Sequence, residues 1–357
     1  MGRSAVNVVE EDFSVSGPTH LDAIDWAKPD HQCSIMACLV QATYVLESDR
    51  KRKNQEPLAP VWWKCFGFEL IKTFVDDKDS SIFGAIFRNT RYNDQTPQAP
   101  RFVITFRGTM LEGGNISQDL SHDLLVGDGG LGSTSRLKKA TQYVDSHISE
   151  FGSEGIFLAG HSLGSSMAML VGANMATKGI HIKTFLFNLP SCLTDEKTSR
   201  RLIARFLQIT PLIVGLAVSV GIFPIATIAS LGMSASVIMI DTLVVASGIA
   251  TLTSLAALIG SCVLAMQKRM MQCQTATPFT PYLFVNPGDP VCKNWVTYFR
   301  NHLKEKKRSP FQLAGFVESG VLSINSTRSG GILEAHGLKQ WWQQGMNLLH
   351  QDEYRLS

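Results

Sequence analysis

The sequence predicts an α/β fold in which a mostly parallel sheet is covered by helices on both faces. Short apolar runs typical of strands alternate with longer segments whose apolar residues recur at helical spacing. One such strand leads directly into a helix through the glycine-flanked turn Gly160-His161-Ser162-Leu163-Gly164. The chain has 357 residues, 45% of them hydrophobic, which suffices for one large α/β domain with insertions or for two small domains.

The N-terminal part is expected to begin irregularly and then to form a helix. Residues 1–30 contain turn-forming residues and no sustained periodicity, so we expect an irregular lead-in there. Apolar residues recur at helical spacing over residues 31–47 and predict a helix. For the basic run Arg50-Lys51-Arg52-Lys53 that follows, we expect a solvated loop, with a membrane-surface or import patch as the alternative.

The remaining elements follow the alternating pattern. Apolar runs predict strands at residues 68–75, 81–87, 102–106, 155–159, 184–188 and 282–286. Helical periodicity predicts helices at residues 135–151, 165–178 and 338–349. In a parallel sheet the carboxyl ends of the strands meet at one edge, and ligands collect there. We therefore expect the functional residues at the ends of these strands.

A long apolar stretch interrupts this pattern between Ile209 and Met266. Its only charged residue is Asp241, and it divides into two apolar runs at residues 209–231 and 243–266. Each run is long enough to cross about 30 Å of hydrocarbon as a helix. Basic residues flank the pair on both sides, as expected for a hairpin whose two ends face the cytosol; they are Arg200, Arg201, Arg205, Lys268 and Arg269.

We therefore predict an inserted apolar helical hairpin over residues 206–268, placed within a catalytic domain formed by residues 31–200 and 270–350. The hairpin is expected to anchor the chain to a membrane through residues 209–266. The alternative is a pair of buried helices that caps the active site, since many small residues and two prolines make the runs only moderately apolar.

Ser162 is the candidate nucleophile. Its Gly-x-Ser-x-Gly motif lies between a predicted strand and a predicted helix, which is the context of the nucleophile elbow in α/β-hydrolases. The sharp turn presents the serine Oγ to a base and an ester. The N–H of Leu163, at the start of the following helix, can face a developing oxyanion.

Serine is a poor nucleophile at neutral pH and needs a base that takes its proton, and the base needs an acid that orients it. In α/β-hydrolases the acid follows the serine along the chain and the histidine comes last. Asp289 lies in Asn286-Pro287-Gly288-Asp289-Pro290, directly after a predicted strand, where such an acid is expected. An ordinary turn aspartate is the alternative.

His336 is the candidate base among the three histidines that follow Asp289. His302 lies among lysines in a predicted amphipathic helix, and His350 lies in a polar C-terminal tail. His336 instead lies on an expected loop before the helix at residues 338–349. His161, inside the elbow, is expected to be structural.

Four segments together resemble the class 3 lipase family of α/β-hydrolases; they are Phe106-Arg107-Gly108-Thr109, residues 160–164, residues 286–290 and Ala335-His336-Gly337. The segment Phe13-Ser14-Val15-Ser16-Gly17-Pro18-Thr19-His20 and the pair Trp341-Trp342 resemble a plant branch often labelled GDSL esterase/lipase, although the sequence contains no Gly-Asp-Ser-Leu motif. The resemblance extends from about Phe13 to Trp342.

The resemblance implies an α/β-hydrolase fold with Ser162, Asp289 and His336 as the catalytic triad. It also implies Thr109 as the second oxyanion residue beside Leu163, and hydrolysis of carboxylic esters or acylglycerols without a metal or an organic cofactor. The sequence departs from simpler members in one respect. About a hundred residues, including the apolar pair, separate Asn188 from Asp289. This insertion suggests that the enzyme acts at or in a membrane.

Charge and cysteine content disfavour several other classes of protein. A net charge of +3 gives no reason to expect a nucleic-acid partner. The seven cysteines are scattered and contain no Cys-x-x-Cys pair, which disfavours a disulfide framework or a structural zinc site. Glu10, Glu11 and Asp12 occur without an apolar core of a signal peptide, so we expect an intracellular protein whose catalytic domain faces the cytosol.

The leading hypothesis is thus a serine acylhydrolase, a lipase or carboxylesterase that acts on lipid esters and associates with a membrane. Two alternatives stay open. One is a membrane-associated interaction protein that retains the fold but has little catalytic activity. The other is a soluble esterase for short esters, with the apolar pair as a cap over the active site.

Overall fold

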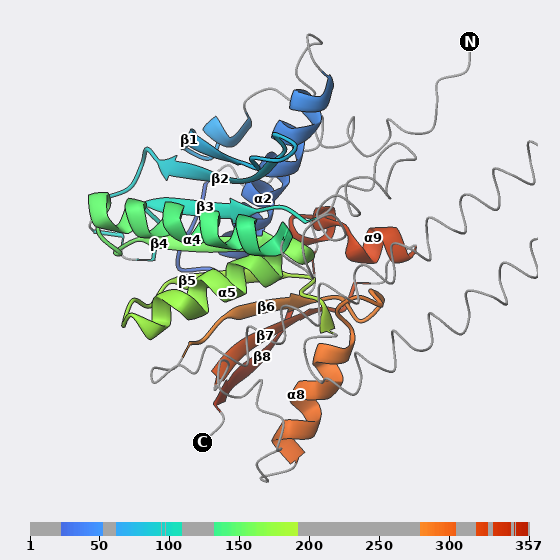
Figure 1. Cartoon of the computed structure of the whole chain (residues 1–357). Helices are drawn as coiled ribbons and strands as arrows, with labels where there is room; N and C mark the ends of the chain where they lie inside the picture. The colour runs from blue at the N-terminus through green and yellow to red at the C-terminus, as the bar shows by residue number, and fades with distance from the viewer. Residues whose placement is uncertain are drawn as a thin grey trace, which may run out of the picture. The chain divides into compact units, whose positions relative to one another are not determined.

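The computed structural model describes residues 23–52, 62–93, 95–96, 98–108, 132–191, 279–304, 319–327, 331–343, 346 and 348–355 (Figure 1). The chain divides into two units, one formed by Met1–Met110, Thr134–Thr194 and Lys268–Ser357, the other by Leu111–Ser133 and Asp195–Gln267. The described elements belong to the first unit, apart from the first two residues of helix α4. The predicted hairpin at residues 206–268 and the oxyanion candidate Thr109 lie outside the described residues, so the domain boundaries stay a prediction.

In the described part of the chain, eight strands form one sheet in the order β1-β2-β3-β4-β5-β6-β7-β8. Strands β3 to β7 run parallel, whereas β1 and β2 at one edge and β8 at the other are antiparallel to their neighbours. The strands are β1 Phe68–Val75, β2 Ile82–Asn89, β3 Phe102–Phe106, β4 Ile156–His161, β5 Lys183–Phe187, β6 Tyr282–Val285, β7 Ser319–Asn325 and β8 Leu348–Arg355. The predicted mostly parallel sheet is confirmed.

Helices cover both faces of this sheet (Figure 1). Helix α2 (Pro29–Arg52) packs on one face, and α4 (Gly132–Phe151) and α5 (Leu163–Thr177) pack on the other. Alternation along the strands explains the division, because successive side chains point to opposite faces. On β5, for example, Phe185 lies in the cluster under α2, whereas the neighbouring Thr184 lies against Gly172 of α5.

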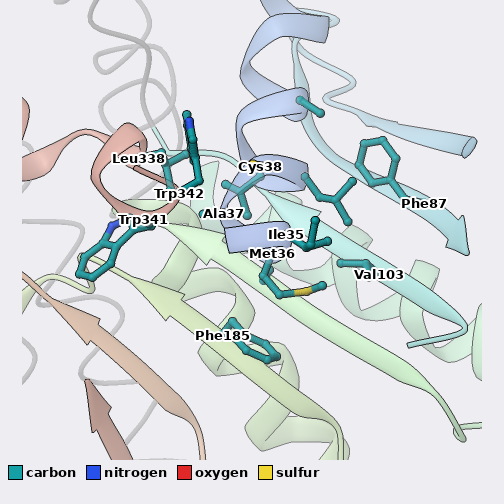
Figure 2. Close-up of a cluster of buried hydrophobic side chains, with 14 of the residues drawn as sticks. Ile35, Met36, Ala37, Cys38, Phe87, Val103, Phe185, Leu338, Trp341 and Trp342 are labelled. Carbon is teal, nitrogen blue, oxygen red and sulfur yellow. The ribbon is translucent and has the colours of Figure 1, made fainter. Parts of the chain in front are cut away.

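The core under α2 joins the two ends of the described chain. Ile35, Met36 and Cys38 of α2 face side chains from β2, β3 and β5, and all three are fully buried (Figure 2). Trp341 and Trp342, more than 300 residues away in the sequence, complete the same cluster. They come from the short 3₁₀ helix η4 (Leu338–Trp341) and the residue after it. The hydroxyl of Ser34 donates a hydrogen bond to the Trp341 carbonyl at 3.1 Å.

Three expectations about local structure are wrong. His336 ends the short helix α9 (Ile332–His336) rather than lying on a loop. The basic residues Arg50, Lys51 and Arg52 form the last turn of α2 rather than a loop, where their charges complement the helix dipole and Arg50 pairs with the buried Glu47. The expected helix at residues 338–349 does not form. Leu338–Trp341 form only a short 3₁₀ helix, and residues 348–355 pair with β7 as strand β8, because the edge of the sheet offers their backbone groups hydrogen-bond partners. His350 therefore lies on a strand.

Three further helices complete the described chain. They are the 3₁₀ helix η1 (Trp62–Lys64), α8 (Asn294–Lys304) and α9 (Ile332–His336). Helix α8 is fixed by Trp295, a fully buried side chain whose indole N–H donates to the Leu189 carbonyl at 2.9 Å. Helix α9 consists of one turn that ends at His336. This short helix, which the sequence pattern did not predict, brings His336 to the carboxyl ends of the parallel strands.

Candidate active site

Ser162 lies at a strained turn between β4 and α5. Its backbone has φ 53° and ψ −123°, a region that non-glycine residues seldom adopt. The turn is held by a hydrogen bond from the Ser162 N–H to the Phe187 carbonyl at 2.9 Å. A side chain at Gly160 would collide with the backbone of Gly164, and one at Gly164 would collide with the backbone of β3. The motif is therefore a true elbow, whose glycines are required by close backbone approach.

The end of strand β3 lies against this elbow. A Cβ atom built at Gly108 would be 3.0 Å from the Cβ of Ser162 and 2.9 Å from the His161 carbonyl oxygen. Leu163 is the first residue of the 15-residue helix α5, so its N–H is at the positive end of the helix dipole. Both features suit a site where negative charge develops on an oxygen near the serine.

Asp289 and His336 are directly paired. The Nδ1 atom of His336 donates a hydrogen bond to Oδ2 of Asp289 at 2.9 Å. The Asp289 side chain is fully buried, and 18% of the His336 side chain is exposed. With Nδ1 carrying the proton that the carboxylate accepts, a neutral His336 has Nε2 as its basic atom. This is the tautomer that a general base requires.

Asp289 is ionised despite its burial. Burial by itself raises the pKa of the carboxyl, but hydrogen bonds from His336 and Asn188 outweigh it and hold the pKa below its ordinary value. The second carboxylate oxygen accepts the Val291 N–H at 2.9 Å. The carboxylate is thus fixed on both oxygens, and its charge can stabilise a protonated His336.

Asn188 is a residue of this site that the sequence analysis did not single out. It follows β5 and has a φ of 50°. Its amide Nδ2 donates to Oδ2 of Asp289 at 2.7 Å and to the Ala335 carbonyl at 3.0 Å, while its Oδ1 accepts the indole N–H of Trp341 at 2.9 Å. One buried amide therefore holds the acid and the histidine segment together. An asparagine directly after a parallel strand was the available sequence signal.

Gln340 also holds the segment around His336. Its Nε2 donates to the Gly337 carbonyl at 2.9 Å, and its Oε1 accepts the amide of Asn286 at 2.6 Å.

His161 also belongs to the site, because its Nε2 lies 2.7 Å from the His336 carbonyl oxygen. The expectation that His161 is only structural stays a prediction, and its contacts are taken up below.

The comparisons with known proteins include a sequence relative that is similar over nearly the whole chain. The chain is 33% identical to the GDSL esterase/lipase At4g10955 of Arabidopsis thaliana over 363 aligned positions, which cover 94% of this chain and 95% of the relative. The chain belongs to this esterase/lipase family. No family model matches the chain. The name of the relative contains the letters GDSL, but the candidate serine of this chain lies in Gly-His-Ser-Leu-Gly and not in a Gly-Asp-Ser-Leu motif.

Solved structures show weaker similarity. A lipase from Rhizopus microsporus var. chinensis is 13% identical, with 88% of this chain and 82% of that chain covered and a TM-score of 0.37. The esterase of the archaeon Pyrobaculum calidifontis is 12% identical, with 91% and 90% covered and a TM-score of 0.36. Lipase II of Rhizopus niveus is 14% identical, with 86% and 82% covered and a TM-score of 0.34. Scores at this level add nothing to the family assignment.

The described residues also bear on the expectations about metal binding and membrane attachment. Among these residues, no group of three or more His, Cys, Asp or Glu side chains is arranged to hold a metal ion. None of the helices in the described ranges combines the length and the hydropathy of a membrane span. Residues 209–266 lie outside those ranges, so the membrane anchor and the cap both stay predictions.

Proposed function

We propose that the protein hydrolyses carboxylic esters of lipids through an acyl-enzyme on Ser162. The observation that carries this proposal is the buried Asp289 carboxylate that fixes Nδ1 of His336, in a sheet whose elbow presents Ser162. Membership of an esterase/lipase family supports the same chemistry. The finer assignment to the class 3 lipases is part of the proposal.

Each group has a defined role in the proposed reaction. Nε2 of His336 takes the proton of Ser162 while the serine Oγ attacks the ester carbonyl carbon. Asp289 stabilises the resulting imidazolium, and the N–H groups of Leu163 and Thr109 stabilise the oxyanion. The imidazolium then protonates the departing alcohol. Water releases the acyl group by the same sequence of proton transfers, so the reaction uses neither a metal nor an organic cofactor.

The membrane attachment is a separate part of the proposal. The apolar pair at residues 209–266, flanked by basic residues on both sides, supports an anchor that leaves the catalytic domain in the cytosol. Flotation of the full chain with phospholipid vesicles, compared with a chain lacking residues 209–266, tests it. An intact chain that stays with the soluble fraction would favour the cap and a soluble esterase.

The catalytic proposal is tested by labelling with a fluorophosphonate, which reacts only with an activated serine. Wild type is expected to label and to hydrolyse p-nitrophenyl esters, and Ser162→Ala to lose labelling and about three or more orders of magnitude in kcat. Ser149→Ala, at an exposed serine on α4, is the matched control and is expected to behave as wild type. Equal activity in wild type and Ser162→Ala would contradict the proposal and favour an interaction protein on a hydrolase fold.

Activity measured on esters of different acyl length tests which class of ester the protein hydrolyses. Activity that rises from short to long p-nitrophenyl esters and requires detergent micelles would support a lipase that works at an interface. Activity confined to short esters in solution would contradict the lipid part of the proposal while leaving Ser162 as the nucleophile.

A further inference from the structure

A chain of hydrogen bonds outside the proposed triad runs behind the elbow. The Gly108 N–H donates to the hydroxyl oxygen of Tyr44, on helix α2, at 2.7 Å. The same hydroxyl lies 2.8 Å from Nδ1 of His161. The Nε2 atom of His161 lies 2.7 Å from the His336 carbonyl oxygen. The chain thus connects the end of β3 to the backbone of the proposed base, through the residue that precedes the nucleophile.

Both ends of this chain fix its direction. The Gly108 N–H can only donate, so the Tyr44 oxygen accepts there and its own proton is available to Nδ1 of His161. The carbonyl oxygen of His336 can only accept, so Nε2 of His161 carries the ring proton. The two requirements demand the same tautomer of His161, with Nδ1 unprotonated and Nε2 protonated. Every group in the chain then has its partner.

The surroundings keep both side chains neutral. Burial, together with the nearby His336, lowers the pKa of His161 to about 3, and only 6% of the residue is exposed. Burial raises the pKa of the Tyr44 phenol, so the hydroxyl retains its proton. The rings also pack closely: the centroids of Tyr44 and His161 are 5.8 Å apart, and those of His161 and His336 are 4.8 Å apart.

We propose that Tyr44 and His161 are positioning residues for the ester hydrolysis proposed above, on which this inference rests. Their hydrogen bonds hold the His336 backbone and the Gly108 end of β3 in register with Ser162. Asp289 and Asn188 fix the His336 segment from one side, and the Tyr44–His161 chain fixes its carbonyl from the elbow side. The helix that covers the sheet thereby takes part in aligning the base.

The test uses the full chain and compares substitutions that keep volume but change hydrogen bonding. Tyr44→Phe removes only the hydroxyl, and Tyr143→Phe, at a tyrosine stacked on Phe74, is the matched control. His161→Gln retains an N–H at the position of Nε2, whereas His161→Leu has a similar volume and no donor. The measured quantities are kcat and KM on a p-nitrophenyl ester, the rate of fluorophosphonate labelling, and Tm.

Tyr44→Phe is expected to lower kcat and the labelling rate about 10-fold or more, with KM within about 2-fold, because misalignment affects the chemical step. Tyr143→Phe is expected to leave both rates unchanged. His161→Gln should retain clearly more activity than His161→Leu at comparable Tm. An unchanged kcat in Tyr44→Phe, or equal losses in the two His161 variants, would overturn the positioning role.

The outcomes separate this inference from the function on which it rests. If wild type labels at Ser162 and Tyr44→Phe is fully active, the positioning role fails and the serine hydrolase stands. If wild type neither labels nor hydrolyses the ester under conditions in which the protein is folded, the proposed function fails, and the positioning role with it.

Discussion

The apolar cluster under α2 and the polar group around Asp289 are both buried, but different forces hold them. The side chains of Ile35, Met36 and Phe185 make non-directional contacts, which tolerate exchange between shapes of similar volume. Asp289 and Asn188 are held by hydrogen bonds with defined partners, and removing a partner takes a hydrogen bond from a buried polar group, which is costly. The comparison teaches that sensitivity to substitution should follow hydrogen bonding rather than burial alone.

The largest expected effect is on catalysis, from Asp289→Asn. An amide at this position can present N–H to Nδ1 of His336 and so stabilise the wrong tautomer, and kcat is expected to fall about 10⁴-fold with little loss of fold. Steady-state kinetics and circular dichroism check this. Asp145→Asn, at an exposed carboxylate paired with Lys178, is the control and should keep wild-type kcat. A loss of less than 10-fold in Asp289→Asn would exclude Asp289 as the orienting acid.

Asn188→Ala is expected to affect stability and activity together. It removes the acceptor of the buried Trp341 indole N–H, and a buried donor left unsatisfied costs about 1–3 kcal/mol. It also removes a hydrogen bond to the Asp289 carboxylate, whereas the Ala335 carbonyl keeps the amide of Gln340 as a donor. We expect a total of about 3 kcal/mol in urea unfolding and a fall in kcat of about 10-fold. Asn174→Ala, in α5, serves as the control. Normal stability in Asn188→Ala would show that the amide does not hold the two segments.

The free energy of unfolding should also decrease as the pH is lowered, and part of this decrease should come from His161. The pKa of His161 is about 3 in the folded protein and about 6.5 in an unfolded chain, so the unfolded state binds the proton more tightly between these values. Stability from this group is complete above pH 6.5 and is lost as the pH falls below it. Between pH 7 and pH 5 the loss is about 2 kcal/mol.

Urea unfolding of wild type and His161→Gln at the two pH values checks this prediction. The variant has no titrating group at this position, so its stability should fall by about 2 kcal/mol less than that of wild type. Because His147 also has a lowered pKa, both proteins are expected to keep a remaining pH dependence. Parallel curves for the two proteins would contradict a buried neutral His161.

The smallest effect is expected in the apolar cluster. Met36→Leu conserves volume at a fully buried position, and the expected loss is below about 1.5 kcal/mol with unchanged kcat. Differential scanning calorimetry and ester hydrolysis measure the two quantities. If Met36→Leu lowered kcat as much as Asn188→Ala, the distinction between the two buried regions would have to be abandoned.

Much of the local structure was predictable from the sequence. The strands β1 and β3 begin and end where the apolar runs do, at residues 68–75 and 102–106. The elbow at Ser162 was predictable because its glycines and its strand and helix flanks are adjacent in the chain. Strand β8 was missed, because its residues have little apolar alternation and form a strand by pairing with β7.

The sequence by itself determined the alternation of strands and helices, the position of the elbow, and the order of the candidate serine, acid and histidine, since these depend on neighbouring residues and on order along the chain. Only the tertiary structure decided which polar groups meet. Asn188 and Asp289 are 101 residues apart, Tyr44 and His161 are 117 apart, and Asn188 and Trp341 are 153 apart. Hydrogen bonds of this kind leave no periodic pattern in the sequence, because each depends on two distant segments folding against the same sheet.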